Sequence, residues 1–305
     1  MSETRTADPI GVIGLGSMGG GIALSLLRAG HKVYGCDLNP ENLKNFTDAG
    51  GVDAPSPAAL ATECDLIFVV VVNAAQTEAV LFGENGAVEA MRSDSVIVSC
   101  ATTSAEFAQS LETRLAEHQI LMLDAPISGG KAKAHSGDLT VMSSGAARAY
   151  DKADAALEAV AETVYRLGDA AGKGSAMKTV NQLLAGVHIA AAAEAMSLGI
   201  KSGLEPDAIY DVITNSAGCS WMFENRVPRI LSGDYTPTSM VKIFTKDLGI
   251  VLDVGKNLPL GLPLSAAAHQ MFISAEGMGL GEDDDSAVIK AYQATGGFDL
   301  PEKKG

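Results

Sequence analysis

The sequence predicts an α/β protein in two domains, an N-terminal doubly wound parallel sheet and an all-α C-terminal domain. Short apolar segments alternate with helical segments up to about residue 168, as in a parallel sheet with helices on both faces. Beyond that residue we find no convincing strand, and residues 173–201, rich in Ala and free of Pro, predict one long helix. We therefore expect domains over residues 1–168 and 169–305, the second including this long interdomain helix.

The predicted strands of the first domain are short and apolar, and two of its helices carry clear boundary signals. Asn39 precedes Pro40 and is expected to cap a helix, because Pro is favoured at the first helical position. Gly30 is expected to end the first helix. The predicted strands are residues 11–14, 32–37, 66–72, 95–99, 120–124 and 139–143, and the predicted helices are residues 17–29, 40–49, 75–81 and 104–117.

The second domain is expected to carry the substrate and subunit contacts. Further helices are predicted over residues 206–215, 240–258 and 264–278, and the acidic run 282–285 is predicted to be a solvated surface turn. Small Ala faces over residues 183–196 of the long helix can pack against a second subunit. A homodimer or homotetramer is therefore expected.

The composition argues against several classes of partner. The net charge is −15 and the pI about 4.7, with no basic stripe, so no nucleic acid partner is expected. The most apolar run, residues 66–72, is far shorter than the roughly 20 residues of a membrane span, and the polar N-terminus does not look like a signal peptide. Four widely spaced cysteines indicate reduced thiols and a cytoplasmic protein. The five histidines share no ligand spacing, so no metal site is expected.

A glycine motif lies between the first predicted strand and the first predicted helix. Gly14-Leu15-Gly16-Ser17-Met18-Gly19 fits G-x-G-x-x-G, a weak signal alone that here has its required strand–turn–helix context. The first glycine permits a tight turn, the second a close approach to a pyrophosphate, and the third close packing of helix and strand. Asp37, at the end of the second strand, would bind the adenosine ribose and repel a 2′-phosphate. These features predict a Rossmann-type domain that prefers NAD to NADP.

Four ordered blocks, which span nearly the whole chain, resemble the β-hydroxyacid dehydrogenases, a family that includes 3-hydroxyisobutyrate dehydrogenase and tartronate semialdehyde reductase. The blocks are the glycine motif, residues 124–130 (Asp-Ala-Pro-Ile-Ser-Gly-Gly), residues 172–182 and Lys246-Asp247-Leu248. Finer features over residues 140–145, 220–226 and 233–237 look like the L-threonate dehydrogenase branch of this family.

Oxidation of a hydroxy acid requires a hydride acceptor, a base for the hydroxyl proton and groups that hold the carboxylate. The resemblance implies that Lys178 is the catalytic acid/base. Its apolar neighbours Ala176, Met177 and Val180 argue against an ordinary surface lysine. A lysine beside a desolvated cofactor cleft can have a lowered pKa and act as a base near neutral pH.

The resemblance also implies substrate contacts on two segments. Ser128, Gly129 and Gly130 are expected to cradle the carboxylate with a hydroxyl and backbone N–H groups. Asn181 and Gln182 share a helix face with Lys178, and either amide can orient the substrate hydroxyl. Many relatives carry Asn where this chain has Gln182, so the choice between the two stays open. The neighbouring Lys131 and Lys133 either steer the anion or are solvated surface lysines.

Further residues are expected against the cofactor, beyond Gly14, Leu15, Gly16, Met18, Gly19 and Asp37. Thr102 follows a strand at the carboxyl edge of the sheet, where such sheets bind ligands, and Thr103 is an alternative. Val72 and Asn73 end the preceding strand and are expected beside the adenosine ribose. Lys246 and Asp247 belong to the helical domain, and in relatives the lysine at the position of Lys246 approaches the nicotinamide; an interdomain salt bridge is the alternative.

The expected function is NAD-dependent oxidation of a short hydroxy acid. L-Threonate, oxidised to 2-oxo-tetronate, is the first expectation, with residues 220–226 as a mixed apolar and polar wall of its pocket or, alternatively, as domain packing. The alternatives are 3-hydroxyisobutyrate, tartronate semialdehyde or 3-hydroxypropionate as substrate. A non-catalytic NAD-binding regulator is an outside alternative, but it would have no reason to retain Lys178.

Overall fold

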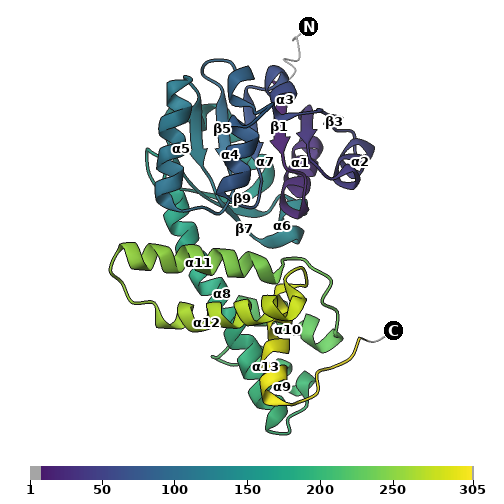
Figure 1. Ribbon diagram of the computed structural model, residues 1–305. Coiled ribbons are helices and arrows are strands. Elements are labelled where there is room, and N and C mark those ends of the chain that lie inside the picture. The colour runs from purple at the N-terminus through teal and green to yellow at the C-terminus, as the bar shows by residue number, and fades with distance from the viewer. Residues whose placement is uncertain (1–7, 304–305) are drawn as a thin grey trace. The chain divides into compact units, whose positions relative to one another are not determined.

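The computed structural model describes residues 8–303 and divides into two compact units, Met1–Lys178 and Thr179–Gly305 (Figure 1). Each unit has its own hydrophobic core. The first unit is an α/β domain, and the second consists of helices. The predicted fold class, a Rossmann-type sheet followed by an all-α domain, is therefore confirmed.

The first unit is built on a nine-stranded sheet. The strand order is β3-β2-β1-β4-β5-β6-β8-β7, and β9 also pairs with β8. Chain order reverses between β1 and β4, and in such a sheet the crevice at the carboxyl ends of these two strands is the place where ligands bind. The strands are β1 (Ile10–Ile13), β2 (Val33–Cys36), β3 (Val52–Asp53), β4 (Leu66–Val69), β5 (Val96–Ser99), β6 (Leu121–Asp124), β7 (Ile127–Ser128), β8 (Leu139–Gly145) and β9 (Ala161–Arg166).

Helices cover both faces of this sheet because its central strands are apolar on both sides. In β5, Val96 and Val98 belong to one core, with α1 and α7, whereas Ile97 belongs to the other, with α3 and α5. This arrangement explains why the strands are continuous apolar runs rather than alternating ones. The helices are α1 (Ser17–Arg28), α2 (Pro40–Asp48), α3 (Pro57–Glu63), α4 (Ala74–Phe82), the short turn η1 (Val88–Ala90), α5 (Ala105–Glu117), α6 (Gly130–Ser136) and α7 (Ala147–Val160).

The sheet differs from the prediction at one edge. The strands β1 to β6 pair in parallel, but β8 runs antiparallel to both β6 and β7. The predicted strand 66–72 ends at Val69, because its partners Ile13 and Ser99 are also the last paired residues of β1 and β5. The signals at Asn39 and Gly30 are confirmed: the Asn39 side chain accepts a hydrogen bond from the Glu41 N–H, and Gly30 has φ +88°.

The second unit packs around the long helix α8 (Lys173–Lys201), which begins at the end of the first unit. Its Ala185, Ile189 and Met196 lie in a core with side chains of the other helices. By length and composition α8 could span a membrane, but half of its most apolar window is buried, as in a core helix. The remaining elements are α9 (Pro206–Thr214), α10 (Trp221–Ser232), α11 (Val241–Asn257), α12 (Pro263–Ala275), the turns η2 (Glu276–Leu280) and η3 (Asp285–Val288), and α13 (Ile289–Gly296).

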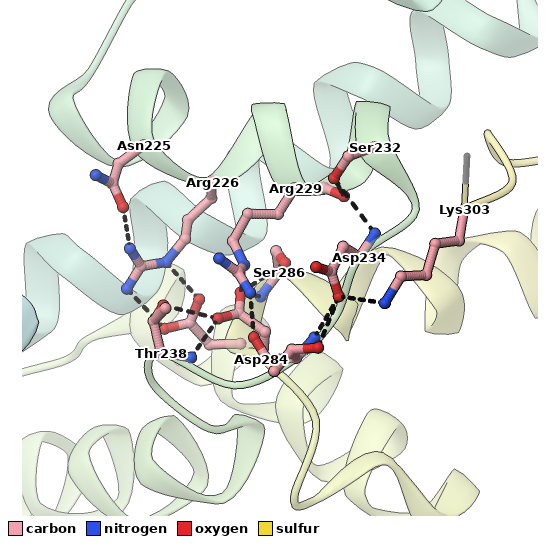
Figure 2. A network of polar contacts seen from close by, with 11 residues as sticks. Asn225, Arg226, Arg229, Ser232, Asp234, Thr238, Asp284, Ser286 and Lys303 are labelled. Carbon is pink, nitrogen blue, oxygen red and sulfur yellow. Dashed lines mark hydrogen bonds and ion pairs between the residues drawn. The ribbon is translucent and has the colours of Figure 1, made fainter. Parts of the chain in front are cut away.

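The acidic run 282–285 is only in part the solvated turn that the sequence predicts, because Glu282 is exposed and Asp283 half-buried but the last two residues are not. Asp284 and Asp285 are fully buried, and both pair with arginines of α10. Figure 2 shows Arg226, Arg229 and Asp284. Arg226 donates to both carboxylate oxygens of Asp285, at 2.5 and 2.9 Å, and Arg229 Nε lies 3.1 Å from Asp284 Oδ1. A buried charge needs a partner of this kind. Because Arg226 lies 59 positions before Asp285 in the sequence, the local sequence of the acidic run does not reveal the pairing.

Candidate functional site

The glycine motif forms the tight turn from β1 into α1. Gly14 has φ +89°, and a Cβ at this position would collide with the Val70 carbonyl oxygen at the end of β4. A Cβ at Gly19 would collide with the backbone of Gly14, whereas a Cβ at Gly16 would meet no protein atom within 4 Å. The first and third glycines are thus required by the fold itself. The space over Gly16 is open to a ligand at the N-terminus of α1.

Asp37 holds its carboxylate against this turn. The N–H of Leu15 donates to Asp37 Oδ2 at 2.5 Å, and the N–H of Asn39 donates to Oδ1 at 2.7 Å. The end of β2 is therefore tied to the glycine loop. Each carboxylate oxygen has a second lone pair, so Asp37 can still accept hydrogen bonds from a ribose.

The other predicted cofactor residues lie at the same carboxyl edge of the sheet. Val72 is 42 % exposed just beyond β4, and its N–H donates to Gln76 at 2.8 Å. Asn73 caps α4, since its side chain accepts from the Gln76 N–H at 2.8 Å. Beyond β5, Thr103 is buried and Thr102 is half-buried. Of the two threonines, Thr102 is the one that a ligand can reach more easily.

Lys178 is a buried lysine near the start of α8. Only 7 % of it is exposed, and its Nζ donates to the carbonyl oxygen of Ile127 at 2.7 Å. Its neighbours Met177 and Val180 are 44 % and 54 % exposed, because they project from other sides of the helix. Lys178 is thus buried, as predicted, but its burial does not come from the apolar side chains of Met177 and Val180.

The first turn of α8 is held by one carboxylate that the sequence analysis did not single out. Asp124 is 2 % exposed and accepts hydrogen bonds from the N–H groups of Gly172 and Ser175, both at 2.9 Å. It also accepts from the Ser175 hydroxyl at 2.6 Å and the Ser144 hydroxyl at 3.3 Å. A carboxylate is well placed there, because the first N–H groups of a helix have no partner within the helix.

The predicted carboxylate cradle follows directly on the acceptor of Lys178. Ser128 is the residue after Ile127 and ends β7, and Gly129 and Gly130 have φ +135° and +71°. Such φ values strain any residue with a Cβ, so the turn requires glycine. Lys178 Nζ is thereby held next to the Ser128–Gly130 turn, within the first unit.

In the second unit, two predicted residues belong to a chain of polar contacts. Asn181 Nδ2 donates to Gln182 Oε1 at 2.9 Å, and Gln182 Nε2 donates to Asp247 Oδ2 at 2.5 Å. Lys246 Nζ lies 2.8 Å from Asp247 Oδ1. Gln182 and Asp247 are buried, whereas Asn181 and Lys246 are half-buried. The Lys246–Asp247 ion pair joins neighbouring residues on α11.

Two family models match the chain in succession. The NAD-binding domain of 6-phosphogluconate dehydrogenase matches residues 9–168, and the NAD-binding part of NADP-dependent 3-hydroxyisobutyrate dehydrogenase matches residues 172–292. The L-threonate dehydrogenase of Cupriavidus necator is 60 % identical over 294 residues, which is 96 % of this chain and 98 % of the relative. The chain belongs to the β-hydroxyacid dehydrogenase family.

Two further relatives show how far the likeness extends. The L-threonate dehydrogenase of Escherichia coli K12 is 48 % identical, with 99 % of each chain covered. The crystal structure of 3-hydroxyisobutyrate dehydrogenase from Salmonella typhimurium is also 48 % identical and has a TM-score of 0.89, covering 92 % of this chain and 99 % of that one. The protein is thus a β-hydroxyacid dehydrogenase that uses a nicotinamide cofactor and acts on a small hydroxy acid, as its sequence predicts.

The residues of this β-hydroxyacid dehydrogenase fit a dinucleotide at the glycine loop. The space over Gly16 is open, and the N–H of the preceding residue, Leu15, holds the Asp37 carboxylate against the same loop. One end of this arrangement offers backbone N–H groups to phosphates, and the other offers an acceptor to ribose hydroxyls.

Proposed function

We propose that the protein oxidises L-threonate to 2-oxo-tetronate with NAD, and that Lys178 is the acid/base. The observation that carries this proposal is the buried Lys178, whose Nζ is fixed 2.7 Å from the Ile127 carbonyl, next to the Ser128–Gly130 turn. A regulator that only bound NAD would not need a buried lysine beside an anion-binding turn. The choice of substrate is supported by relatives named L-threonate dehydrogenase, which are 48–60 % identical to this chain.

Lys178 performs the proton transfer in this proposal. The carbonyl of Ile127 accepts one hydrogen bond from Nζ and so fixes its position. When the amine is neutral, its lone pair takes the proton of the substrate hydroxyl, and the resulting ammonium returns it in the reverse reaction. The bound nicotinamide supplies the hydride acceptor.

The substrate carboxylate lies at Ser128, Gly129 and Gly130 in this proposal. Both glycines have positive φ, and the backbone N–H groups of such a turn can donate to an anion together with the Ser128 hydroxyl. Asn181 then orients the substrate, rather than Gln182. Gln182 is buried with its Oε1 and Nε2 both engaged, whereas Asn181 is half-buried and keeps its carbonyl oxygen for a ligand among the contacts described for residues 8–303.

Cofactor choice is assigned to Asp37. Its carboxylate is held at the glycine loop by Leu15 and Asn39, so it cannot turn away from a phosphate on the ribose 2′ position. Like charges held close together repel one another, which favours NAD over NADP. Val72, Asn73, Thr102 and Lys246 complete the proposed cofactor contacts.

The second candidate substrate is 3-hydroxyisobutyrate, which is favoured by the similarity to the 3-hydroxyisobutyrate dehydrogenase of Salmonella typhimurium. Within residues 220–226, Phe223 and Arg226 are buried in the second unit, which leaves Trp221, Met222 and Asn225 among the side chains of this segment that can reach a substrate. The test compares kcat/KM for L-threonate, D-threonate, D-erythronate and 3-hydroxyisobutyrate by NADH production. L-Threonate should exceed 3-hydroxyisobutyrate by roughly 10⁴ or more, because a pocket built for hydroxyls leaves its donors unpaired without them. A preference for 3-hydroxyisobutyrate overturns the substrate assignment.

A cytoplasmic homo-oligomer completes the proposal. Much of the small Ala face does not supply the subunit contact as predicted, because Ala185, Ala190 and Ala193 are buried in the core of their own unit. Leu184 and Leu198 of the same helix, α8, are 50 % and 69 % exposed and are available for such a contact. The cysteines Cys36, Cys64, Cys100 and Cys219 are all free thiols, which supports a reducing compartment. Light scattering of the purified protein tests the assembly.

A further inference from the structure

A cavity of about 180 Å³ lies beside the glycine loop, on the side of α2 and α6. Gly16 and Ser17 of the loop border it, and Asn42 and Asn45 of α2 form a polar wall. Lys131 of α6, together with the His135 ring, forms a cationic wall. Of these lining residues, only Gly16 and Ser17 belong to the G-x-G-x-x-G motif. The side chains on α6 lie more than a hundred positions further along the chain, so no motif links them to the loop.

Close packing of α6 on α1 produces the cationic wall. A Cβ at Gly21 of α1 would lie 2.7 Å from the carbonyl carbon of Ala134, so only glycine lets α6 approach so closely. The Ser25 hydroxyl donates to the Ala134 carbonyl at 3.0 Å, and the Arg28 guanidinium donates to the His135 carbonyl. Lys131 and His135 are one helical turn apart and therefore share the face that borders the cavity.

Positive charge in this wall is uncompensated, in a chain with a net charge of −15. Within residues 8–303, the cavity lining includes no carboxylate, and Lys131 forms no ion pair. Lys133, two residues later, instead pairs with Glu162 at 3.0 Å and does not line the cavity. Burial, followed by the charges of Lys131 and Arg28, lowers the pKa of His135, so its ring is neutral at neutral pH and the positive charge of this wall is that of Lys131.

We propose that Lys131 and His135 bind a phosphate group in this cavity, and that the group belongs to the diphosphate of the bound dinucleotide. Gly16 and Ser17 line the same cavity, so a phosphate at the N-terminus of α1 lies within its walls. The neutral amides of Asn42 and Asn45 add donors without adding charge. This inference rests on the proposed use of a dinucleotide and extends its binding site to α6.

The test measures NADH binding by fluorescence titration, with no hydroxy acid present, in wild type, Lys131→Gln and the matched control Lys133→Gln. Lys131→Gln should weaken NADH and ADP-ribose about three- to tenfold, the size of a partly solvent-screened charge-assisted contact. It should also flatten the dependence of NADH affinity on NaCl concentration. Lys133→Gln should stay within about twofold of wild type. Adenosine, which has no phosphate, should bind all three proteins equally.

Three results would overturn the proposal. The first is equal NADH affinity in Lys131→Gln and Lys133→Gln. The second is an equal loss for adenosine, which would place the defect away from the phosphates. The third comes from calorimetric titration with inorganic phosphate: if Lys131→Gln abolishes phosphate binding but leaves NADH affinity unchanged, the site takes a free anion. None of these measurements depends on which hydroxy acid is oxidised, so their failure is distinguishable from a wrong substrate.

Discussion

The Asp124 carboxylate accepts two hydrogen bonds from Ser175, one from its backbone N–H at 2.9 Å and one from its hydroxyl at 2.6 Å. Ser175 lies in the first turn of α8, three residues before Lys178. Ile127, three residues after Asp124, accepts the hydrogen bond from Lys178 Nζ. One short segment thus holds both the start of the helix and the end of the lysine side chain.

Replacement of Asp124 by Asn should therefore impair both stability and turnover. In the wild type, hydrogen-bond donors reach both carboxylate oxygens of Asp124, whereas the Asn side chain has only one acceptor oxygen. The free energy of unfolding should therefore fall by about 1–3 kcal/mol. The value of kcat should fall by a larger factor than the change in KM, because a shift of the first turn of α8 also displaces Lys178, which follows in the next turn. Steady-state kinetics and thermal unfolding measure the two effects. Glu112→Gln is the matched control, since the Glu112 carboxylate accepts a hydrogen bond from the Ala171 N–H, just before the start of α8. An unchanged kcat in Asp124→Asn with a lowered Tm would leave Asp124 with a purely structural role.

Lys178→Met should fold and bind NADH but lose turnover. General acid–base groups contribute roughly 10²–10⁴-fold to rate, so kcat should fall by that factor. Lys173→Met is the control, because Lys173 is exposed one and a half turns earlier in the same helix. In the wild type, the pH–rate profile should rise as a group loses its proton, and this limb should disappear in Lys178→Met. Retention of more than about a tenth of the wild-type rate would exclude Lys178 as the base.

Asp37→Ala should narrow the preference for NAD. The carboxylate is fixed by Leu15 and Asn39, so its removal takes away a held negative charge rather than a mobile one. The ratio of kcat/KM for NAD and NADP should fall roughly tenfold or more, the size of a close like-charge contact near a protein surface. Asp53→Asn, at the exposed end of β3, should leave the ratio unchanged. Equal use of both cofactors by the wild type would contradict the assignment of Asp37.

Local signals explain what could be predicted from the sequence. The glycine motif, the Asn39 cap and the boundaries of α8 depend on neighbouring residues, and the structure agrees with them. The missed features depend on distant partners. Asp124 holds the start of α8 through hydrogen bonds from Gly172 and Ser175, which lie about fifty positions later in the sequence. Asp284 and Asp285 are buried where they pair with arginines of α10.

The helix α10 was missed because Pro228 lies inside it. A proline cannot donate to the carbonyl four residues earlier, which normally breaks a helix. Here the hydroxyl of Tyr210, from α9, donates to that carbonyl of Glu224 at 3.3 Å. The compensation comes from another helix, so the sequence of α10 gives no sign of it.

Thr238→Val should destabilise the protein more at neutral pH than in acid. Burial alone would raise the pKa of Asp284, but hydrogen bonds from Thr238 and Ser286 outweigh it, and the pKa is lowered. A lowered carboxyl pKa stabilises the fold above the unfolded value, and this contribution is lost as the pH falls through the folded value. The Tm difference between wild type and Thr238→Val should therefore shrink below about pH 4. Thr236→Val, which removes an exposed bond to Asp234, should show a smaller difference. A Tm difference independent of pH would contradict the charge-dependent role.

Asn181 and Gln182 should give opposite results on substitution. Gln182 is buried and donates to the buried Asp247, so Gln182→Leu leaves that carboxylate short of a donor and should cost about 1–3 kcal/mol of stability. Asn181 is half-buried and bonds only to Gln182 among the hydrogen bonds described for residues 8–303, so Asn181→Ala should leave the Tm nearly unchanged. If its amide orients the substrate hydroxyl, kcat/KM for the hydroxy acid should fall about tenfold while NADH affinity is retained. The two variants are compared by thermal unfolding, NADH titration and initial rates. A Gln182→Leu protein with the wild-type Tm and a lowered kcat/KM, beside an active Asn181→Ala protein, would reverse the assignment and make Gln182 the residue that contacts the substrate.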